Sequence, residues 1–292
     1  MSAVVDAVAT SPLAYRRRLL RTRFLRRPLA VASLVVVLLF VAAAAFAPYV
    51  APESAGRTDF DLLLAPPSWR HLFGTDELGR DVFSRVVWGA RASLQVGFLS
   101  TLLAIVIAVP IGLLAGYHGR WVDAIVARAT DVLLAFPFVI LAVGLAAIRG
   151  PSLTTATIAL GVAAAPGVIR ITRGEALALR EAEFVPAAIA SGARDTTILF
   201  RHLLPNMTAT LLVQATVLIP RAIIGEATLS FLGLGVRPPQ ASWGVMLQDA
   251  QSYLTQAPRL AVYPGLAIVL AALAFNLLGD EVRDILDPRT AR

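Results

Sequence analysis

Long stretches of this chain carry no charged side chain, and this feature restricts its fold more than any other. Residues 29–52 and residues 92–117 contain none. A bilayer core about 30 Å thick is crossed by roughly 20 residues of helix, so each stretch is long enough to span it. Only 15% of the residues are charged, against about 25% in soluble proteins. We therefore expect an all-α integral membrane protein.

Six segments are expected to cross the membrane as one helical bundle. They are 29–50, 92–119, about 126–148, 150–169, 206–232 and 260–279. A cleaved signal peptide is the alternative for the first, because small residues recur at 42–47. The apolar part of a signal peptide is usually about 7–15 residues long, and the run here is longer, which favours a retained span.

Arginine indicates the orientation, since the chain contains no lysine. Arginines cluster before the first span, between the fourth and fifth, and after the sixth. Excess positive charge marks the cytoplasmic side, so both termini are expected there. The expected parts are a basic cytoplasmic segment 1–28, a first span 29–50, an extracytoplasmic loop 51–91, a five-helix core 92–280 and a cytoplasmic tail 281–292. The five arginines within 53–91 do not follow the rule.

Composition also excludes several functions. Without lysine the chain cannot form a GxxxxGK[ST] phosphate loop, so it cannot hydrolyse ATP by that route. Without cysteine it has no thiolate ligand or nucleophile. HExxH and GxSxG motifs do not occur, and the arginines lack the interleaved aromatics of a nucleic-acid surface. We expect no catalytic residue, no cofactor or metal bound by this chain, and no nucleic-acid partner.

The segment EFVPAAIASGARDTTILFRHLLPN (183–206) interrupts the apolar pattern. Pro186 suits the first turn of a helix, where its missing N–H costs nothing, and Gly192 can end that helix. Residues 193–204 predict a second short amphipathic helix, and Pro205 marks the start of the fifth span. These features predict a helix–turn–helix elbow at 183–205. The residues alone leave two roles open: a handle held by another protein, or an ordinary loop on the membrane surface.

The pattern AA-x₃-G-x₁₁-LP of this elbow resembles the EAA loop of ABC-importer permeases. Other blocks are similar, in order, to the dipeptide/oligopeptide/nickel permease family, and in particular to its second, "C"-type subunit. They are FGTDELGRDVFSRVVWGARASL (73–94), DVLLAFPF (131–138), RGEALALREAEFV (173–185), GEATLSFLGLGVRPPQASWG (225–244) and FNLLGDEVRDILDPR (275–289). The resemblance extends from about residue 70 to the C-terminus.

The resemblance implies a six-transmembrane-helix ABC type I importer permease bundle in a bacterial inner (plasma) membrane, with 92–280 as its permease core. It implies uptake of di- or oligopeptides, with nickel or other small solutes as the alternative; an ATP-independent secondary transporter is less favoured. Implied partners are a homologous second permease subunit, two ATP-binding subunits or domains that use ATP and Mg, an extracytoplasmic solute-binding protein and membrane lipid.

By the same resemblance, the elbow would contact the ATPase. The residues carried over are Glu183, Pro186, Ala187, Ala188, Gly192, Arg194, Asp195, Leu204 and Pro205. Pro186 stands where the family has the glutamate that names the loop, so Glu183 or the nearby Glu181 is the candidate acidic contact.

Two charges lie within the fifth predicted span, Arg221 and Glu226. Charges inside a membrane usually face a cavity or a partner, because exposure to lipid is costly. They could meet the termini of a peptide, or serve packing and gating, which we favour. At the start of the third span, Arg128 and Asp131 are expected to pair at the interface, and Trp243 is expected to anchor its loop at an interface or to touch a binding protein.

Overall fold

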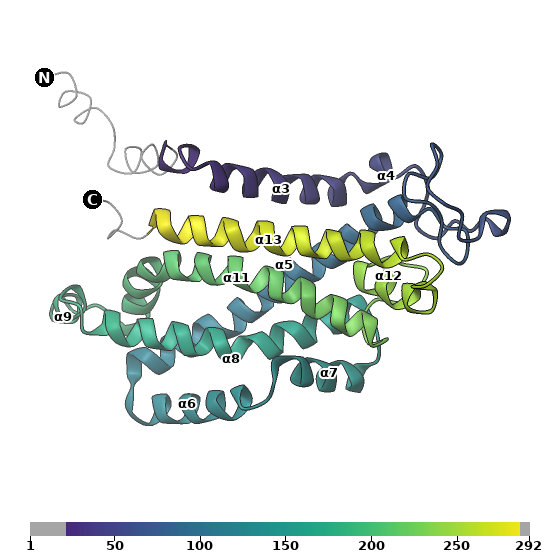
Figure 1. The fold of residues 1–292 in the computed structure, drawn as a ribbon. Coiled ribbons are helices and arrows are strands. Elements are labelled where there is room, and N and C mark those ends of the chain that lie inside the picture. Colours follow the sequence, from purple (N-terminus) through teal and green to yellow (C-terminus); the bar gives the residue numbers. More distant parts are fainter. Residues whose placement is uncertain (1–21, 287–292) are drawn as a thin grey trace, which may run out of the picture.

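The computed structural model describes residues 22–286, which form a bundle of helices (Figure 1). In this part of the chain, the only β pairing is an isolated bridge between Thr75 and Asp81. The expected basic segment 1–28 and tail 281–292 lie partly outside the described residues.

Five helices are long and apolar enough to cross a membrane, and a bent pair makes up to six. The five contain α3 (Pro28–Ala45), α5 (Val82–His118), α8 (Leu153–Arg180), α11 (Leu204–Phe231) and α13 (Arg259–Leu286). The bent pair is α6 (Arg120–Leu134) and α7 (Phe138–Arg149). Shorter helices are α4 (Ala47–Val50), α9 (Phe184–Ala190), α10 (Asp195–Thr197) and α12 (Trp243–Ala250).

The third predicted span is not one continuous helix. Its halves α6 and α7 meet at 89° across the break at 135–137. Pro137 explains the break, because proline has no N–H for the helix and pushes the residue before it out of the helical region. The expectation of one straight helix over 126–148 is therefore wrong.

Several helices extend beyond the predicted spans. Helix α5 begins at Val82, inside the expected loop 51–91, where the Asp81 carboxylate accepts a hydrogen bond from the Ser84 N–H at 2.7 Å. Helix α8 continues to Arg180, and the fifth spanning helix runs unbroken from Asp195 into α11. The helices thus continue with polar residues beyond the apolar runs from which the spans were predicted.

The most extensive helix contact in the bundle joins α5 and α8, and glycines bring the two helices together there. A Cβ on Gly112 would lie 2.6 Å from the Thr172 Cβ, and one on Gly116 would lie 2.5 Å from the Ala176 Cβ. Gly161 makes a similar approach from α8. In lipid, helices associate through close packing of small residues, since burial from water does not drive them together. This contact therefore fixes the centre of the bundle.

The two ends of the described chain lie on the same side of the bundle, together with α9 (Figure 1). Arg27, just before α3, makes ion pairs with Glu281 at 2.8 Å and Asp284 at 3.0 Å, both in α13. We call this side the elbow end. The same-side placement of these two described ends agrees with the sequence prediction.

At the opposite side, which we call the loop end, a buried ion cluster joins the segment before α5 to α12. Arg80 contacts Asp76 at 2.6 Å and Glu77 at 2.5 Å, while Arg85 contacts Asp76 at 3.3 Å and Asp249 at 3.0 Å. Burial, and then the neighbouring Asp76 carboxylate, raise the pKa of Glu77. Buried charges persist only when paired and hydrogen-bonded, so this cluster ties the loop to the bundle.

The glycine contact predicts a steric effect. We expect Gly116→Ala to destabilise the protein by about 1–3 kcal/mol, because the added methyl group overpacks the α5–α8 contact. The measurement is the thermal denaturation midpoint in detergent. Gly265→Ala is the control, since no atom lies within 4 Å of a Cβ built there; equal midpoints for the two variants would contradict the prediction.

The ion cluster predicts a second stability difference. Asp249→Ala leaves the buried Arg85 with one carboxylate instead of two, so we expect a loss of about 1–3 kcal/mol, again read from the denaturation midpoint. The control is Arg57→Ala, which removes the exposed arginine of an ion pair with Glu53 and is expected to change stability by less than about 1 kcal/mol. If Asp249→Ala and Arg57→Ala had the same denaturation midpoint, the cluster would not contribute to stability as predicted.

Candidate functional site

The predicted helix–turn at the elbow is present, and its hydrogen bonds explain the sequence. Pro186 lies in the first turn of α9. After α9, Gly192 adopts φ +78°, a left-handed conformation that glycine accepts without strain. The Gly192 N–H donates to the Ile189 carbonyl at 2.9 Å, and the Ala193 N–H to the Ala188 carbonyl at 3.0 Å. This pair of bonds is the Schellman motif, which ends the helix and fixes the direction of the turn.

The second arm of the elbow leads directly into the fifth spanning helix. Residues 198–203 form a π-helical turn, in which the Leu204 N–H donates to the Leu199 carbonyl. Pro205 accounts for this turn, because it lacks the N–H that would continue an α-helix. The side chain of Asn206 donates to the His202 carbonyl at 2.7 Å and so satisfies a carbonyl group beside the proline. The arm is therefore rigidly joined to α11.

Apolar side chains hold the elbow against the bundle. Ile198, Leu199 and Leu203 are buried in a cluster with Val185 of α9 and Leu113 of α5. Ala188 and Leu204, from the predicted coupling set, are half-buried against the same cluster. These two residues shape the elbow from within and do not belong to its outer surface.

The outer surface of α9 is exposed and uncharged. Pro186, Ala187 and Gly192 are exposed, and so is Ile189, of which 56% is accessible. A hollow of about 610 Å³ adjoins this surface, and Tyr117 of α5 contributes to its lining. The sequence analysis missed Ile189 as a contact candidate, although its place between the small residues of AAIASG could have identified it.

The charged members of the predicted coupling set separate into two groups. Asp195 accepts a hydrogen bond from the Tyr117 hydroxyl at 2.8 Å and so links the elbow to the end of α5. Glu183 and Arg194 are exposed and make no ion pair within the described chain. The same is true of Glu181. Pro205, the last member, is exposed at the start of α11.

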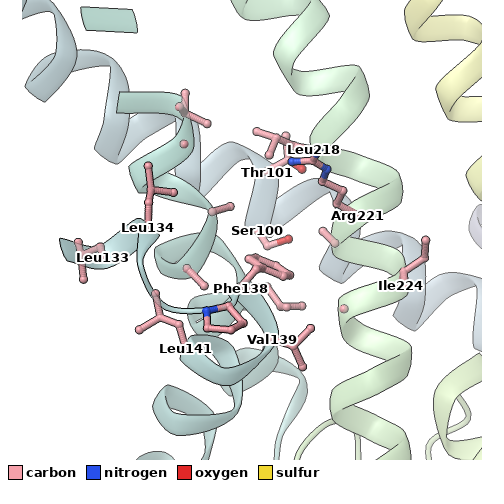
Figure 2. Close-up of a pocket in the computed structure, with 18 of the residues that line it drawn as sticks. Ser100, Thr101, Leu133, Leu134, Phe138, Val139, Leu141, Leu218, Arg221 and Ile224 are labelled. Carbon is pink, nitrogen blue, oxygen red and sulfur yellow. The ribbon is translucent and has the colours of Figure 1, made fainter. Parts of the chain in front are cut away.

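A second feature is a cavity of about 590 Å³ between α5, α8, α11 and the break that separates α6 from α7 (Figure 2). Leu134, Phe136 and Phe138 line it from the break. Non-helical backbone at membrane depth is tolerated where it is buried in protein or lines a cavity, which is the situation here. Gly225 of α11 packs against Leu160 of α8 beside this cavity.

The two charges of the fifth span have different surroundings. Glu226 is completely buried and accepts hydrogen bonds from the Ser93 hydroxyl at 2.8 Å and the Ser230 hydroxyl at 2.6 Å, a packing arrangement. Arg221 is exposed and lines the cavity (Figure 2). Only Arg221 is therefore placed to meet a solute.

Two other expectations are wrong. Asp131 pairs with Arg170 of α8 at 2.7 Å and not with Arg128, since the opposing helix presents the closer guanidinium. Trp243 is no interfacial anchor: it is fully buried, and its indole N–H donates to the Val86 carbonyl at 3.0 Å. Within residues 22–286, no group of three or more His, Cys, Asp or Glu side chains is placed to hold a metal ion.

The sequence analysis also missed the ion cluster of the loop end and the helix break. The residues of this cluster lie in the block FGTDELGRDVFSR, which was used only as a marker of the family. Their partner in the cluster, Asp249, is far away in the sequence. The break had a visible signal in Pro137, which the sequence analysis treated as a tolerated proline within a span.

Known proteins share this sequence and fold. Residues 108–292 match the family described as "Binding-protein-dependent transport system inner membrane component", and residues 16–67 match the "N-terminal TM domain of oligopeptide transport permease C".

Among curated relatives, the dipeptide transport system permease protein DppC of Alkalihalophilus pseudofirmus is 43% identical over 90% of this chain and 87% of that protein. The glutathione transport system permease protein GsiD of Pectobacterium atrosepticum is 45% identical over 91% of this chain and 89% of that protein.

Among solved structures, an inward-facing MetNI methionine ABC transporter matches with a TM-score of 0.54 and 25% identity, over 70% of this chain and 97% of the matched chain. The matching helices, the membrane-spanning lengths and the extent of the family match lead to one conclusion. The chain belongs to the family of binding-protein-dependent transport system inner membrane components, as a permease subunit.

Proposed function

We propose that this permease subunit serves an ATP-driven importer of di- or oligopeptides and forms half of the translocation path. The observation that carries the substrate class is the cavity. Its lining is mostly apolar and contains one charged side chain, Arg221, with a few polar groups such as Gln214 and Thr101. Such a surface suits a small solute that carries a carboxylate and apolar side chains. The names of the relatives DppC and GsiD, for dipeptide and glutathione transport, support the same class.

The alternative cargo is nickel or another small solute, and of these a nickel ion fits the cavity less well. Its lining contains no Asp, Glu or His, which are the side chains that commonly bind such ions. An ATP-independent transporter is also less favoured, because the family match is to a binding-protein-dependent system.

We further propose that the elbow is the contact for an ATPase subunit at the cytoplasmic side. The exposed uncharged surface of α9, the hollow beside it and the rigid connection into α11 support this role. Movement of a partner held there would pass into a helix that reaches the cavity, as packed elements transmit motion in switching proteins. The remaining partners would be a second permease subunit, a second ATP-binding subunit and an extracytoplasmic solute-binding protein.

Reconstitution tests the proposed function. The complete transporter, purified with the subunits it recruits and placed in proteoliposomes, is expected to accumulate a labelled dipeptide when ATP and its binding protein are supplied. Unlabelled dipeptides and tripeptides should compete with this uptake, and nickel should not. Uptake that continues without ATP, driven by a proton gradient alone, would contradict the importer assignment.

The absence of cysteine from the chain allows a direct test of the elbow. We expect Ser191→Cys, at the exposed end of α9, to be joined to a lysine of the ATPase subunit by a short cross-linker with a maleimide for the new thiol and a succinimidyl ester for the amine. Ser252→Cys is the control, since Ser252 is equally exposed but lies at the loop end. The products are separated by electrophoresis and identified by mass. A cross-link from Ser252→Cys alone would place the ATPase on the wrong side for this proposal.

A further inference from the structure

Arg221 is the one charged side chain in the lining of the cavity, and it lies far along α11 from the elbow end. Leu204, where α11 begins, is about 26 Å away along the helix at 1.5 Å per residue. Gln214, Leu218, Arg221, Gly225 and Thr228 lie at helical spacing and all face this cavity. A charge at such depth faces a cavity or a partner group because lipid does not solvate it.

The guanidinium has no counter-charge on this chain. Arg221 makes no ion pair among the described residues, and the lining contains no carboxylate. In Glu226, the nearest acidic residue of α11, both carboxylate oxygens accept hydrogen bonds, from the hydroxyls of Ser93 and Ser230. One positive charge in the cavity is therefore unbalanced.

A hydroxyl group in the same lining also lacks a partner. Thr101 is only 5% exposed, and its Oγ1 makes no hydrogen bond. Its neighbour Ser100 differs, because the Ser100 hydroxyl donates to the Val96 carbonyl at 2.6 Å. A buried hydroxyl without a partner is costly, so its partner is expected to be a group that enters the cavity. The side chains of Thr101 and Arg221 both appear in the close-up of this cavity (Figure 2).

The helix break adds positive potential to the cavity. Helix α7 begins at Phe138, with Pro137 before it and no side-chain cap on its first turn. Phe136, Pro137, Phe138 and Val139 all belong to the lining, so the N-terminal end of α7 adjoins the cavity. The free N–H groups of a helix N-terminus carry partial positive charge. Interrupted membrane helices present such ends to anionic groups of transported solutes.

We propose that Arg221 and Thr101 form a binding site for a carboxylate of the transported solute, which for a peptide is its C-terminal carboxylate. The proposal rests on the proposed function, because it assigns the substrate group that this part of the path receives. Arg221 supplies the charge, Thr101 donates its hydroxyl, and the end of α7 adds favourable potential. The site holds the peptide by its terminus and leaves the side chains to the apolar wall, so it accepts peptides of varied sequence.

The test uses the complete transporter in proteoliposomes, with its binding protein loaded to saturation with a labelled dipeptide. Arg221→Gln is expected to lower the uptake rate about tenfold, the effect of losing one charge-assisted contact. Arg221→Lys should restore most of the rate, and Thr101→Val should lower it by a smaller factor. Arg149→Gln is the matched control: it removes an exposed arginine at the far end of α7, outside the cavity, and should transport at the unaltered rate.

Two results would overturn the inference. One is an unaltered uptake rate for Arg221→Gln. The other is loss of the second permease subunit from purified Arg221→Gln, which would show that Arg221 pairs with a carboxylate of that subunit. Failure of the proposed function is recognised separately, because the unmutated transporter would then accumulate no dipeptide in the presence of ATP and loaded binding protein.

Discussion

The contact between α5 and α8 is the interaction on which the rest of this structure depends. Gly112, Gly116 and Gly161 bring the two helices so close that their backbones nearly touch. Both helices then supply walls of the cavity, and Tyr117 at the end of α5 holds Asp195 of the elbow. Because burial from water contributes little inside a bilayer, this steric fit positions both candidate sites relative to each other.

Charged side chains inside the described bundle differ in whether this chain supplies their partners. Arg80 and Arg85 are surrounded by carboxylates, and Glu226 by hydroxyls. These charges have all their partners on this chain, and the contacts hold together segments that are far apart in the sequence. Arg221 has no such partner among the described residues, and it lies in a cavity. A charged side chain with partners on the same chain stabilises the fold, whereas one without such partners is available to bind another molecule.

Much of the fold was visible in the sequence because the bilayer imposes a length on every apolar run. The turn at Gly192 was predictable too, since its hydrogen bonds are local. The start of α5 at Val82 was not, because it places Arg85 in a buried position whose ion pair with Asp249, a residue of a distant helix, is not visible in the local sequence. The pairing of Asp131 with Arg170 likewise depends on how α6 meets α8. Local signals predicted local structure, and pairings across the bundle required the coordinates.

The unbroken helix from Asp195 to Phe231 has a mechanical consequence. It packs against α8 at Gly225, where a Cβ would lie 2.6 Å from Leu160. With that contact as the pivot, the arm toward the elbow measures about 45 Å and the arm toward Phe231 about 9 Å, at 1.5 Å per residue. The helix is then a lever with a ratio of about five. On the proposed role of the elbow, a wide swing there would become a small displacement at the loop end, and Arg221, about 6 Å from the pivot, would move little.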